Sequence, residues 1–410
     1  MNGTRQSARA RVTGPTDHVP DDQSAVSAFL ANPATHGQAC TRVERIDTHG
    51  AMVFLAGERA YKVKRAVRFP YMDFSTLDLR RRACEREVEL NRRTAPELYI
   101  GSVPITRAAG GALALDGTGE AVEWAVVMRR FAQEALGDRL AQAGRLTPEL
   151  AAALADEVAV FHEGAEPLFG AAAAGGGAAG LGAVIDENLD ELRARPEIFA
   201  ATELAALTAA SRAALEQAAA LLDARLAAGL VRRCHGDLHL RNVCVVDGRP
   251  RLFDCIEFND AIACIDVLYD LAFLLMDLEH RGLRPLANLV LNRYVQRRDD
   301  VAGLAALPLF LSTRAAVRAK VSVSIADSQA DPAAARRLHD EATAYFRAAC
   351  AYLQPVDPIL VAIGGLSGTG KTCLARDLAP GLGASPGATA TPRTPHQRWS
   401  SGNWPTTLGR

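Results

Sequence analysis

Cys234-His235-Gly236-Asp237-Leu238-His239-Leu240-Arg241-Asn242 is the stretch that decides the fold, and a second acidic segment, Leu252-Phe253-Asp254, follows it closely. Between the two lies Asp247-Gly248, a dipeptide favoured in tight β-hairpin turns. Asn242 and Asp254 each lie six positions from the glycine of that turn. An antiparallel pairing is therefore expected to place their side-chain oxygens opposite each other, at the ends of two short strands.

These side chains have the chemistry and spacing of a phosphoryl-transfer site. A carboxylate and an amide oxygen that converge can bind Mg²⁺ carrying ATP, because Mg²⁺ takes a few carboxylates plus substrate phosphate oxygens. Asp237 lies five residues before Asn242, the spacing between the catalytic aspartate and the metal-binding asparagine of kinase catalytic loops. The alternative is a polar turn in which Asn242 is a cap and Asp254 ends a strand. The occurrence of Asp237, Asn242 and Asp254 within one loop and hairpin favours a kinase site over a polar turn.

At this point the chain resembles a known family. His235–Asn242 and Ile265–Ala272 are similar to the aminoglycoside phosphotransferase group of small-molecule kinases, whose fold is similar to that of protein kinases. More narrowly, the chain resembles bacterial bifunctional proteins that join such a domain to a P-loop domain, an AAA-type predicted kinase. The segments that carry this second resemblance are Thr48-His49, Val53–Leu55, Tyr61–Lys64, Leu90–Arg93 and Arg314–Lys320. The resemblance covers most of residues 25 to 372 and implies Asp237 as catalytic base, with Asn242 and Asp254 as metal ligands.

Lysine is rare in this chain, since only four of its 46 basic residues are lysines, at positions 62, 64, 320 and 371. A planar guanidinium and a compact ammonium are not interchangeable at a phosphate site, so the retained lysines attract attention. The alternating segment 60–65, the third strand candidate after 42–47 and 52–55, places Lys62 and Lys64 on one face. Kinases pair a lysine of this strand with a helix glutamate. In the predicted helix 77–94 we expect Glu87 to be the partner, and both lysines stay candidates for the ATP phosphates.

Two further features concern ATP. Thr48-His49-Gly50 stands between the first two strands in place of a Gly-x-Gly-x-x-Gly loop, so the phosphate cover is expected to be short. The strand Val122–Met128 is predicted to end the smaller lobe. Met128–Phe131 would then be the hinge, with the backbone at Met128 pairing with adenine.

The fold class predicted from these features is α+β, a bilobal protein-kinase-like fold followed by an incomplete α/β P-loop NTPase fragment. Residues 25–130 would form the N-lobe and 131–353 a helical C-lobe. In the C-lobe, the glycines of Gly170–Gly180 favour a flexible loop. The apolar helix 265–278 is expected to be buried against the catalytic loop. Within this helix, Asp270 is expected to hydrogen-bond the backbone of that loop.

A second phosphate motif follows at 354–383. Ile359–Ile363 is predicted to be a strand, and Gly365-Leu-Ser-Gly-Thr-Gly370-Lys371-Thr372 fits the Walker A pattern. Its glycine backbone, Lys371 and Thr372 would hold phosphates and Mg²⁺. A complete domain needs several further strands and an acid after Asp377, so the fragment is interpreted as vestigial. Residues 1–24 and 384–410 lack apolar periodicity and are predicted to be disordered, the tail as the product of a frameshift or premature end.

Composition narrows the class of protein. A net charge of -1 and a pI near 6.8 give no general attraction for nucleic acid or anionic lipid, and no stretch approaches a membrane span. The eight cysteines contain no C-x-x-C pair and no secretory segment precedes them, which indicates the cytoplasm. A zinc site at Cys234, Cys244, Cys255 and Cys264 is disfavoured by their spacing.

We therefore predict an ATP- and Mg²⁺-dependent kinase acting on a hydroxyl of a small molecule. Two alternatives remain: a pseudokinase that binds nucleotide as a regulatory module, and chemistry located in the P-loop segment. The acceptor is open. The acidic residues Asp186, Glu187, Asp190 and Glu191 could attract a polycation, although a solvated helix face explains them better.

Overall fold

The computed structural model describes residues 21–355, 361, 363–366 and 368–382. The chain divides into two compact units, Met1–Val356 and Asp357–Arg410. Among the described residues, no helix is long and apolar enough to cross a bilayer.

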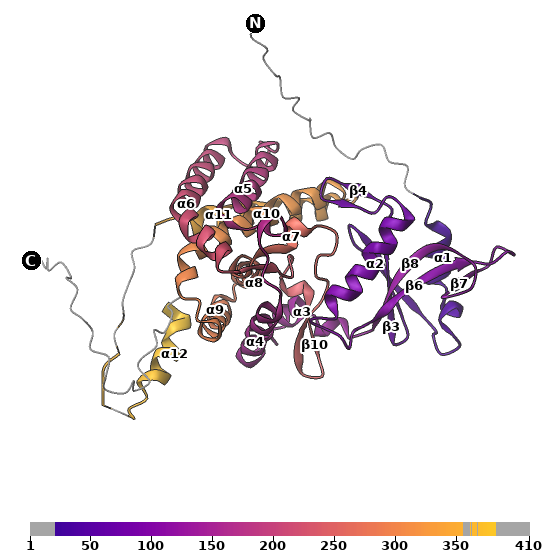
Figure 1. Ribbon diagram of the computed structural model, residues 1–410, viewed down its shortest axis with the longest axis horizontal. Coiled ribbons are helices and arrows are strands. Elements are labelled where there is room, and N and C mark those ends of the chain that lie inside the picture. The colour runs from indigo at the N-terminus through magenta and orange to yellow at the C-terminus, as the bar shows by residue number, and fades with distance from the viewer. Residues whose placement is uncertain (1–20, 356–360, 362, 367, 383–410) are drawn as a thin grey trace, which may run out of the picture. The chain divides into compact units, whose positions relative to one another are not determined.

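The first part of unit 1 is a six-stranded antiparallel sheet with the order β1-β2-β3-β8-β6-β7 (Figure 1). Its strands are β1 (Val43–Asp47), β2 (Ala51–Ala56), β3 (Arg59–Lys64), β6 (Tyr99–Arg107), β7 (Leu113–Leu115) and β8 (Glu120–Arg129). The strand predictions at 42–47, 52–55, 60–65 and 122–128 are confirmed by β1, β2, β3 and β8. A small hairpin, β4 (Arg68–Phe69) with β5 (Met72–Asp73), follows β3.

Helices cover both faces of this sheet, because apolar side chains along its strands point alternately to one face and to the other. Tyr61 and Val63 of β3 pack with Val26 and Leu30 of α1 (Ser24–Ala31). Ala60 lies on the opposite face, in a cluster with Cys84 and Val88 of α2 (Leu77–Asn91). Since side chains two apart in a strand share a face, Lys62 and Lys64 point to the α2 side. The strand periodicity thus aims both lysines at the glutamate helix.

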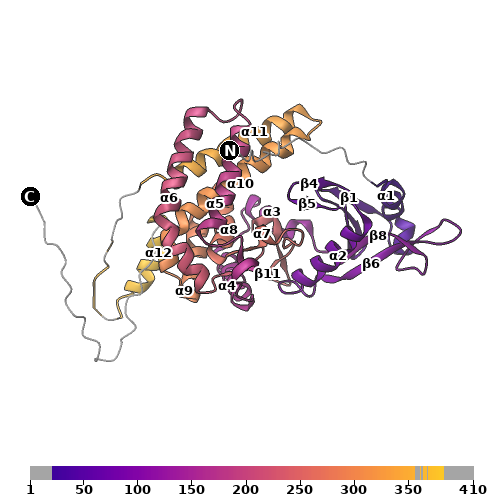
Figure 2. The ribbon, with the colours of Figure 1, turned by 45° about the horizontal axis from the view of Figure 1, so that its top comes forward.

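The rest of unit 1 is helical (Figure 2). Its helices are α3 (Gly137–Gln142), α4 (Pro148–Gly164), α5 (Gly177–Arg193), α6 (Ala201–Ala227), α7 (Asp260–Ala263), α8 (Val267–His280), α9 (Arg284–Arg298), α10 (Leu307–Asp327) and α11 (Pro332–Tyr352). Residues 267–278 of α8 are all buried, so the predicted burial of this apolar helix is confirmed. Helix and sheet are thus mixed in the way that the predicted kinase-like fold requires.

Two short antiparallel pairs lie among these helices, namely β10 (Val243–Val246) with β11 (Arg249–Leu252) and β9 (Val231–Arg233) with β12 (Cys264–Asp266). The register of the first pair corrects one prediction. Both Asp247 (φ 49°) and Gly248 (φ 76°) are left-handed, as a two-residue turn requires, so the centre of the hairpin lies between them. Asn242 is therefore opposite Phe253, whose N–H it accepts at 3.0 Å, and Asp254 lies one residue beyond.

The glycine-rich run 170–180 also differs from its prediction as a flexible loop. It forms a short 3₁₀ helix, Gly170–Ala173, and then the start of α5. Its glycines meet close neighbours: a Cβ added at Gly176 would lie 2.3 Å from Val231, and one at Gly180 would lie 2.4 Å from the backbone of Gly175. Glycine is therefore needed for tight backbone packing rather than for flexibility.

Unit 2 is described only around the Walker A pattern. Residues 359, 360 and 362 of the predicted strand lie outside the described residues, and Val361 and Ile363 are not in a strand. Gly368 and Gly370 are left-handed (φ 80° and 79°), and α12 (Lys371–Leu382) follows them. The Lys371 ammonium donates to the carbonyl oxygen of Leu366 at 2.5 Å. A loop and helix are thus present, but a P-loop domain is not supported.

The predicted disordered ends fall almost wholly outside the described residues, which begin at Asp21 and end at 382. At the N-terminal boundary, the Gln23 side chain donates to the carbonyl of Lys64 and to the carboxylate of Glu123, both at 2.8 Å. The segment just before α1 is thereby fixed to β3 and β8.

Candidate active site

The loop that carries Asp237 runs from β9 to β10 and ends in a 3₁₀ turn, Leu240–Asn242. Gly236 is left-handed (φ 84°), and a Cβ there would lie 3.2–3.3 Å from Ile256 and Ala263. Glycine is required at this position for both reasons. The sharp turn brings Asp237 out of the packed loop, with its side chain 37% exposed.

Buried acids of α8 hold this loop by its backbone. The Asp270 carboxylate accepts hydrogen bonds from the N–H groups of His235 (3.1 Å) and Gly236 (2.9 Å), and Asp277 accepts from the N–H of Leu240 at 2.9 Å. The prediction for Asp270 is confirmed. Burial raises the pKa of the Asp270 carboxyl, but His162, whose Nε2 lies 3.0 Å away, and nearby cations outweigh it, so the net shift is downward.

Arg314 of α10 supports the same loop from another side. Its guanidinium donates to the carbonyls of Gly236 (3.3 Å) and Tyr269 (3.1 Å). It also lies over the ring of Tyr269, 3.9 Å from the centroid, and over that of Phe273 at 4.8 Å. The side chain is 3% exposed. This arginine is therefore part of the support of the loop.

Asp237 is surrounded by hydrogen-bond donors and positive charge. The Asn242 amide donates to its carboxylate at 3.0 Å and to its carbonyl at 2.9 Å, and the Nε2 of His239 lies 3.3 Å from the carboxylate. Desolvation raises the pKa of the Asp237 carboxyl, but His239 and Arg318 outweigh it and hold this pKa well below its usual range. The carboxylate is thus kept ionised, as a proton acceptor must be.

Asp254 has a strained backbone at the end of the hairpin. Its φ is +64°, a region that non-glycine residues seldom occupy and that is most accessible to Asn and Asp. The hydroxyl of Tyr99 accepts a hydrogen bond from the N–H of Asp254 at 3.1 Å, and Asn91 accepts from the next N–H, that of Cys255, at 2.8 Å. The carboxylate, 40% exposed, forms an ion pair with Lys62.

The two lysines of β3 share one glutamate of α2. Lys62 lies 2.9 Å from Oε1 of Glu87, and Lys64 forms an ion pair with Oε2 of the same carboxylate. Lys64 also pairs with Glu257. The result is an alternating series of five charges, Asp254–Lys62–Glu87–Lys64–Glu257. The predicted pairing of a strand lysine with Glu87 is confirmed, and it involves both lysines.

Burial and charge act in opposite directions on these groups. Desolvation lowers the pKa of Lys62, but Asp254 and Glu87 more than compensate, and the net pKa lies well above its ordinary value. Desolvation raises the pKa of Asp254, but Lys62 and Lys64 bring it below its ordinary value. Both groups therefore stay charged.

Sequence reasoning missed Glu257, Asn91 and Tyr99. Asn91 donates from its amide to the carbonyl of Glu87 at 2.8 Å while its oxygen accepts from Cys255, so it joins α2 to the segment after Asp254. Glu257 could have been predicted from its position, because it lies only three residues after Asp254. The stretch Leu90–Arg93 drew attention only through its family resemblance.

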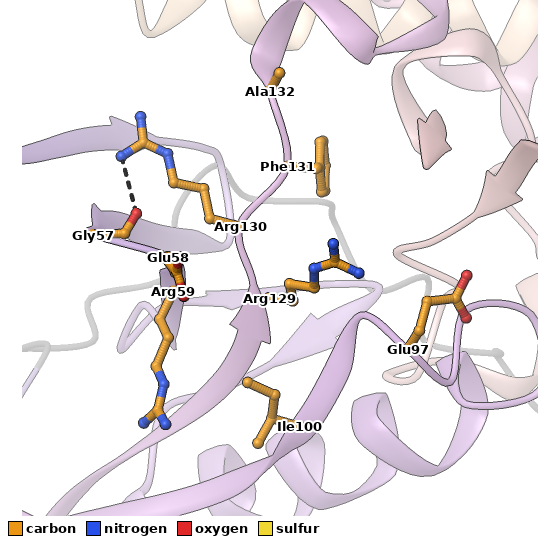
Figure 3. Close-up of a pocket in the computed structure, with 9 residues that line it drawn as sticks. All are labelled: Gly57, Glu58, Arg59, Glu97, Ile100, Arg129, Arg130, Phe131 and Ala132. Atoms are coloured by element: carbon orange, nitrogen blue, oxygen red, sulfur yellow. Dashed lines mark hydrogen bonds between the residues drawn. The ribbon is translucent and has the colours of Figure 1, made fainter. Parts of the chain in front are cut away.

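The segment after β8 carries an aromatic contact to the catalytic hairpin. The ring of Phe131 meets that of Phe253 edge-on at 5.3 Å, and Met128 is buried at the end of β8. A cavity of about 610 Å³ lies beside this segment. Figure 3 shows the residues that line it, namely Gly57–Arg59, Glu97, Ile100 and Arg129–Ala132. None of the predicted catalytic or metal-binding residues lines it, so we do not place the chemistry there.

The other residues considered in the sequence, His49 and four cysteines, pack against neighbouring side chains or are buried. His49, in the turn between β1 and β2, stacks on Phe69 of β4 at 4.2 Å. Cys234, Cys244, Cys255 and Cys264 are free and buried. Within the described residues, the one group with metal-ligand proximity is His162, Cys234 and Asp270. Since His162 also contacts Tyr294 at 2.8 Å and Asp270 holds the loop, these side chains are already engaged.

The chain is similar in sequence to a known family and to bacterial proteins. The sequence model described as "Phosphotransferase enzyme family" matches residues 55–307. Uncharacterized proteins of Mycobacterium tuberculosis and Mycobacterium bovis are 34% identical over 342 residues, which is 82% of this chain and 65% of theirs. The chain thus spans just under two thirds of the length of these relatives.

Solved structures of kinases are similar at low identity. A choline/ethanolamine kinase family protein from Mesorhizobium loti is 15% identical, with 80% of this chain and 97% of that chain covered and a TM-score of 0.43. Choline kinase from Cryptosporidium parvum is 10% identical, with coverages of 80% and 93% and a TM-score of 0.47. A thermostable mutant of the aminoglycoside phosphotransferase APH(4)-Ia, in complex with AMP-PNP and hygromycin B, is 15% identical, with coverages of 79% and 99% and a TM-score of 0.43.

Proposed function

The chain belongs to the phosphotransferase enzyme family, and on that premise we propose that it transfers the γ-phosphoryl group of ATP, with Mg²⁺, to a hydroxyl of a small molecule. Phosphoryl transfer by a small-molecule kinase follows from the family. ATP, Mg²⁺ and the roles of individual residues are the proposal. The observation that carries it is the convergence of Asp237, Asn242 and Asp254 beside the Lys62–Glu87 pair.

Asp237 is proposed as the group that orients the acceptor hydroxyl and takes its proton. It is the exposed acid of the loop, and its ionised form is stabilised by His239 and Asn242. Because little bond-making falls to the protein in phosphoryl transfer, its contribution is mainly position and charge. The backbone supports from Asp270 and Arg314 serve that purpose by fixing the loop.

Asn242 and Asp254 are proposed to hold Mg²⁺. Their donor set fits, since a hard cation prefers carboxylate and amide oxygens. The Asn242 nitrogen is used by Asp237, so its oxygen is the atom left for a metal. The Asp254 carboxylate already attracts a cation, the Lys62 ammonium. When bound there, Mg²⁺ would neutralise charge on the phosphate oxygens.

Of the two lysines, Lys62 is proposed to contact the phosphates. Its side chain is 12% exposed and lies between Glu87 and the proposed metal ligand, whereas Lys64 is 3% exposed and is enclosed by two carboxylates. The sequence prediction that the backbone at Met128 pairs with adenine is not kept, because Met128 lies inside β8, paired with Ala60 of β3 and Tyr99 of β6. Adenine is proposed to meet the rest of the predicted hinge, Arg129–Phe131.

The acceptor is proposed to be a small molecule with a hydroxyl, without a requirement for positive charge. The acids of α5 that could attract a polycation have partners: Glu187 and Glu191 lie 2.7 and 3.1 Å from Lys320, Asp190 lies 2.5 Å from Arg193, and Asp186 lies 3.5 Å from Arg212. Paired charges present little net field.

The Walker A pattern supports a secondary role at most. Gly365, Gly370, Lys371 and Thr372 are proposed as a phosphate-binding loop that takes no part in the transfer. The left-handed glycines before α12 are compatible with this role. The kinship with two-domain bacterial kinases stays part of this proposal.

The test is a transfer assay with γ-labelled ATP and Mg²⁺ against a library of hydroxyl-bearing metabolites. Labelled product that requires Mg²⁺ and disappears in Asp237→Asn would support the proposal. Binding of Mg²⁺-ATP without turnover, even to water, would favour the regulatory pseudokinase. Turnover that survives Asp237→Asn but not Lys371→Ala would locate the chemistry in the P-loop segment.

A further inference from the structure

Two buried carboxylates compete for positive charge at the base of the proposed nucleotide site. Glu87 and Glu257 are 0% and 6% exposed, and the Lys64 ammonium forms ion pairs with both. Each carboxylate raises the energy of the other, because like charges in a low-dielectric interior repel strongly. Lys64 is therefore the charge that makes their proximity tolerable.

Lys62 differs from Lys64, because the partners of Lys62 must change during the proposed reaction. It pairs with Glu87 and with Asp254. Asp254 is proposed to bind Mg²⁺ and Lys62 to bind phosphates, so the Lys62–Asp254 contact has to give way when Mg²⁺-ATP enters. Lys62 can turn to the phosphates only if it does not have to balance Glu257 as well as Glu87, and Lys64 supplies that balance.

We propose that Lys64 and Glu257 form a positioning pair for the transfer reaction: Lys64 neutralises Glu87 and Glu257 together and so leaves Lys62 free to bind the ATP phosphates. The inference rests on the proposed function and deepens it by separating the roles of the two lysines. Neither Lys64 nor Glu257 touches the nucleotide in this arrangement. Both act through Lys62 and Asp254.

Glu257 also connects the pair to the proposed metal ligand, since only Cys255 and Ile256 separate it from Asp254. Cys255 donates its N–H to Asn91, and Ile256 donates its N–H to the carbonyl of His235 at 2.9 Å. The contact of Lys64 with Glu257 therefore fixes the far end of a segment whose near end is Asp254. A shift of Lys64 would be transmitted to both Glu87 and the proposed metal site.

The competing interpretation is that Lys64 itself binds phosphate. Its burial disfavours this, since its side chain is 3% exposed, and so does its location 5.3 Å from the ring centroid of Phe74, within a closed contact. Desolvation lowers the pKa of Lys64, but Glu257 and Glu87 more than restore it, so the net shift is upward and the ammonium stays charged.

The experiment is a double-mutant cycle on the full chain, read by the affinity for Mg²⁺-ATP in calorimetry at pH 7.5, which needs no acceptor. Lys64→Met leaves Glu257 without a partner, so Lys62 is drawn toward the carboxylates and the affinity should fall by about tenfold or more. Adding Glu257→Gln removes the unpaired charge and should restore the affinity to within about threefold of wild type. Because this double variant removes both charges of a buried pair, it is also the variant expected to fold well.

Lys62→Met is the matched control, since this lysine is proposed to bind phosphate directly and Glu257→Gln should not rescue it. Two results would overturn the inference: a folded Lys64→Met/Glu257→Gln protein that binds as weakly as Lys64→Met, which would assign Lys64 to the phosphates, and a Lys64→Met protein with wild-type affinity. Failure of the proposed function would look different, because the wild-type chain would then transfer no label from ATP, or its affinity for Mg²⁺-ATP would be lost in Lys371→Ala.

Discussion

Asn242 donates a hydrogen bond from its side-chain amide to the carboxylate of Asp237 at 3.0 Å. This bond leaves the amide oxygen of Asn242 for a metal and orients the carboxylate from the side. A proposed metal ligand and a proposed base are thus held together by one hydrogen bond.

Asp237→Asn should reduce transfer by about 10²–10⁴-fold, the usual contribution of a general base, because an amide cannot accept the acceptor's proton. The affinity for ATP should stay within about twofold, since Asp237 is not proposed to hold nucleotide. Transfer kinetics and nucleotide titration measure the two effects. The control is Asp247→Asn, a change of an exposed acid at a hairpin turn that favours Asn. Equal losses of rate and ATP affinity would contradict the role of Asp237.

The pH dependence of transfer should reflect the lowered pKa of Asp237. Desolvation raises this pKa, but His239 and Arg318 lower it below the ordinary 3.8. A carboxyl with a depressed folded pKa contributes stability above its unfolded pKa, and this contribution is lost as the pH falls through the folded value. The base is therefore ionised from neutral pH down past pH 4, and it should cause no acidic limb in that window.

Arg318→Gln should raise the pKa of Asp237 and so move the acidic limb of the pH–rate profile upward, with rates that converge with wild type near pH 8. Lys320→Gln removes a cation that pairs with Glu187 and Glu191 and serves as control. Identical profiles for Arg318→Gln and wild type between pH 3.5 and 8 would show that Arg318 does not act on the base.

Asp254→Asn should weaken activation by Mg²⁺ by about tenfold or more, because it removes the charged ligand. It should keep most of the stability, since asparagine tolerates the left-handed backbone at φ +64°. Asp254→Ala removes the same ligand but should unfold about 1 kcal/mol more easily, because of the backbone strain. Mg²⁺ titration and thermal denaturation together test this. Unchanged dependence on Mg²⁺ in Asp254→Asn would exclude this carboxylate as the metal ligand.

Asp270→Asn should destabilise the protein by about 2–4 kcal/mol, because the N–H groups of His235 and Gly236 use different carboxylate oxygens and an amide nitrogen would face one of them. Transfer should fall as well, as the loop that presents Asp237 loosens. Asp299→Asn, at an exposed left-handed position that follows α9 and lies outside the site, is the control. Denaturant unfolding gives the free energy, and near-equal free energies of unfolding for the two variants would show that Asp270 does not stabilise the loop.

Lys371→Ala should leave transfer within about twofold of wild type, whereas Lys62→Ala should lower it by about 10²-fold or more. The reason is that only Lys62 belongs to the site with Asp237 and Asp254. Initial rates at saturating ATP give the comparison. A severe loss of transfer rate in Lys371→Ala, with the protein still folded, would show that the Walker A segment takes part in the reaction.

The local chemistry of the site was accessible from the sequence, and its exact geometry was not. Periodicity placed Lys62 and Lys64 on the face that meets Glu87, and the acid inside the apolar helix predicted the backbone contacts of Asp270. The position of Asp254 was predicted one residue out of register, because counting from Gly248 ignores that both turn residues are left-handed. Turn geometry, and not residue spacing, sets the centre of a hairpin.

Long-range contacts account for the other differences. Glu257 and Lys64 are 193 residues apart, and no local pattern reports such a pair. Gly176 and Gly180 were interpreted from composition as flexible, although each is fixed by a backbone or side chain distant in sequence or in an adjoining turn. Close packing selects glycine as strongly as mobility does, and a single sequence does not distinguish the two causes.

The attachment of α2 at Glu87 and Asn91 has a consequence for control of the enzyme. Swinging this helix outward would leave buried charges unpaired and would break the contact with the N–H of Cys255, at a cost of about 3–5 kcal/mol for one such charge. An off state with a displaced helix would thus hold under about one molecule in a hundred at equilibrium. A switch that displaces this helix would therefore need a ligand or partner that binds the displaced state more tightly by at least that free energy.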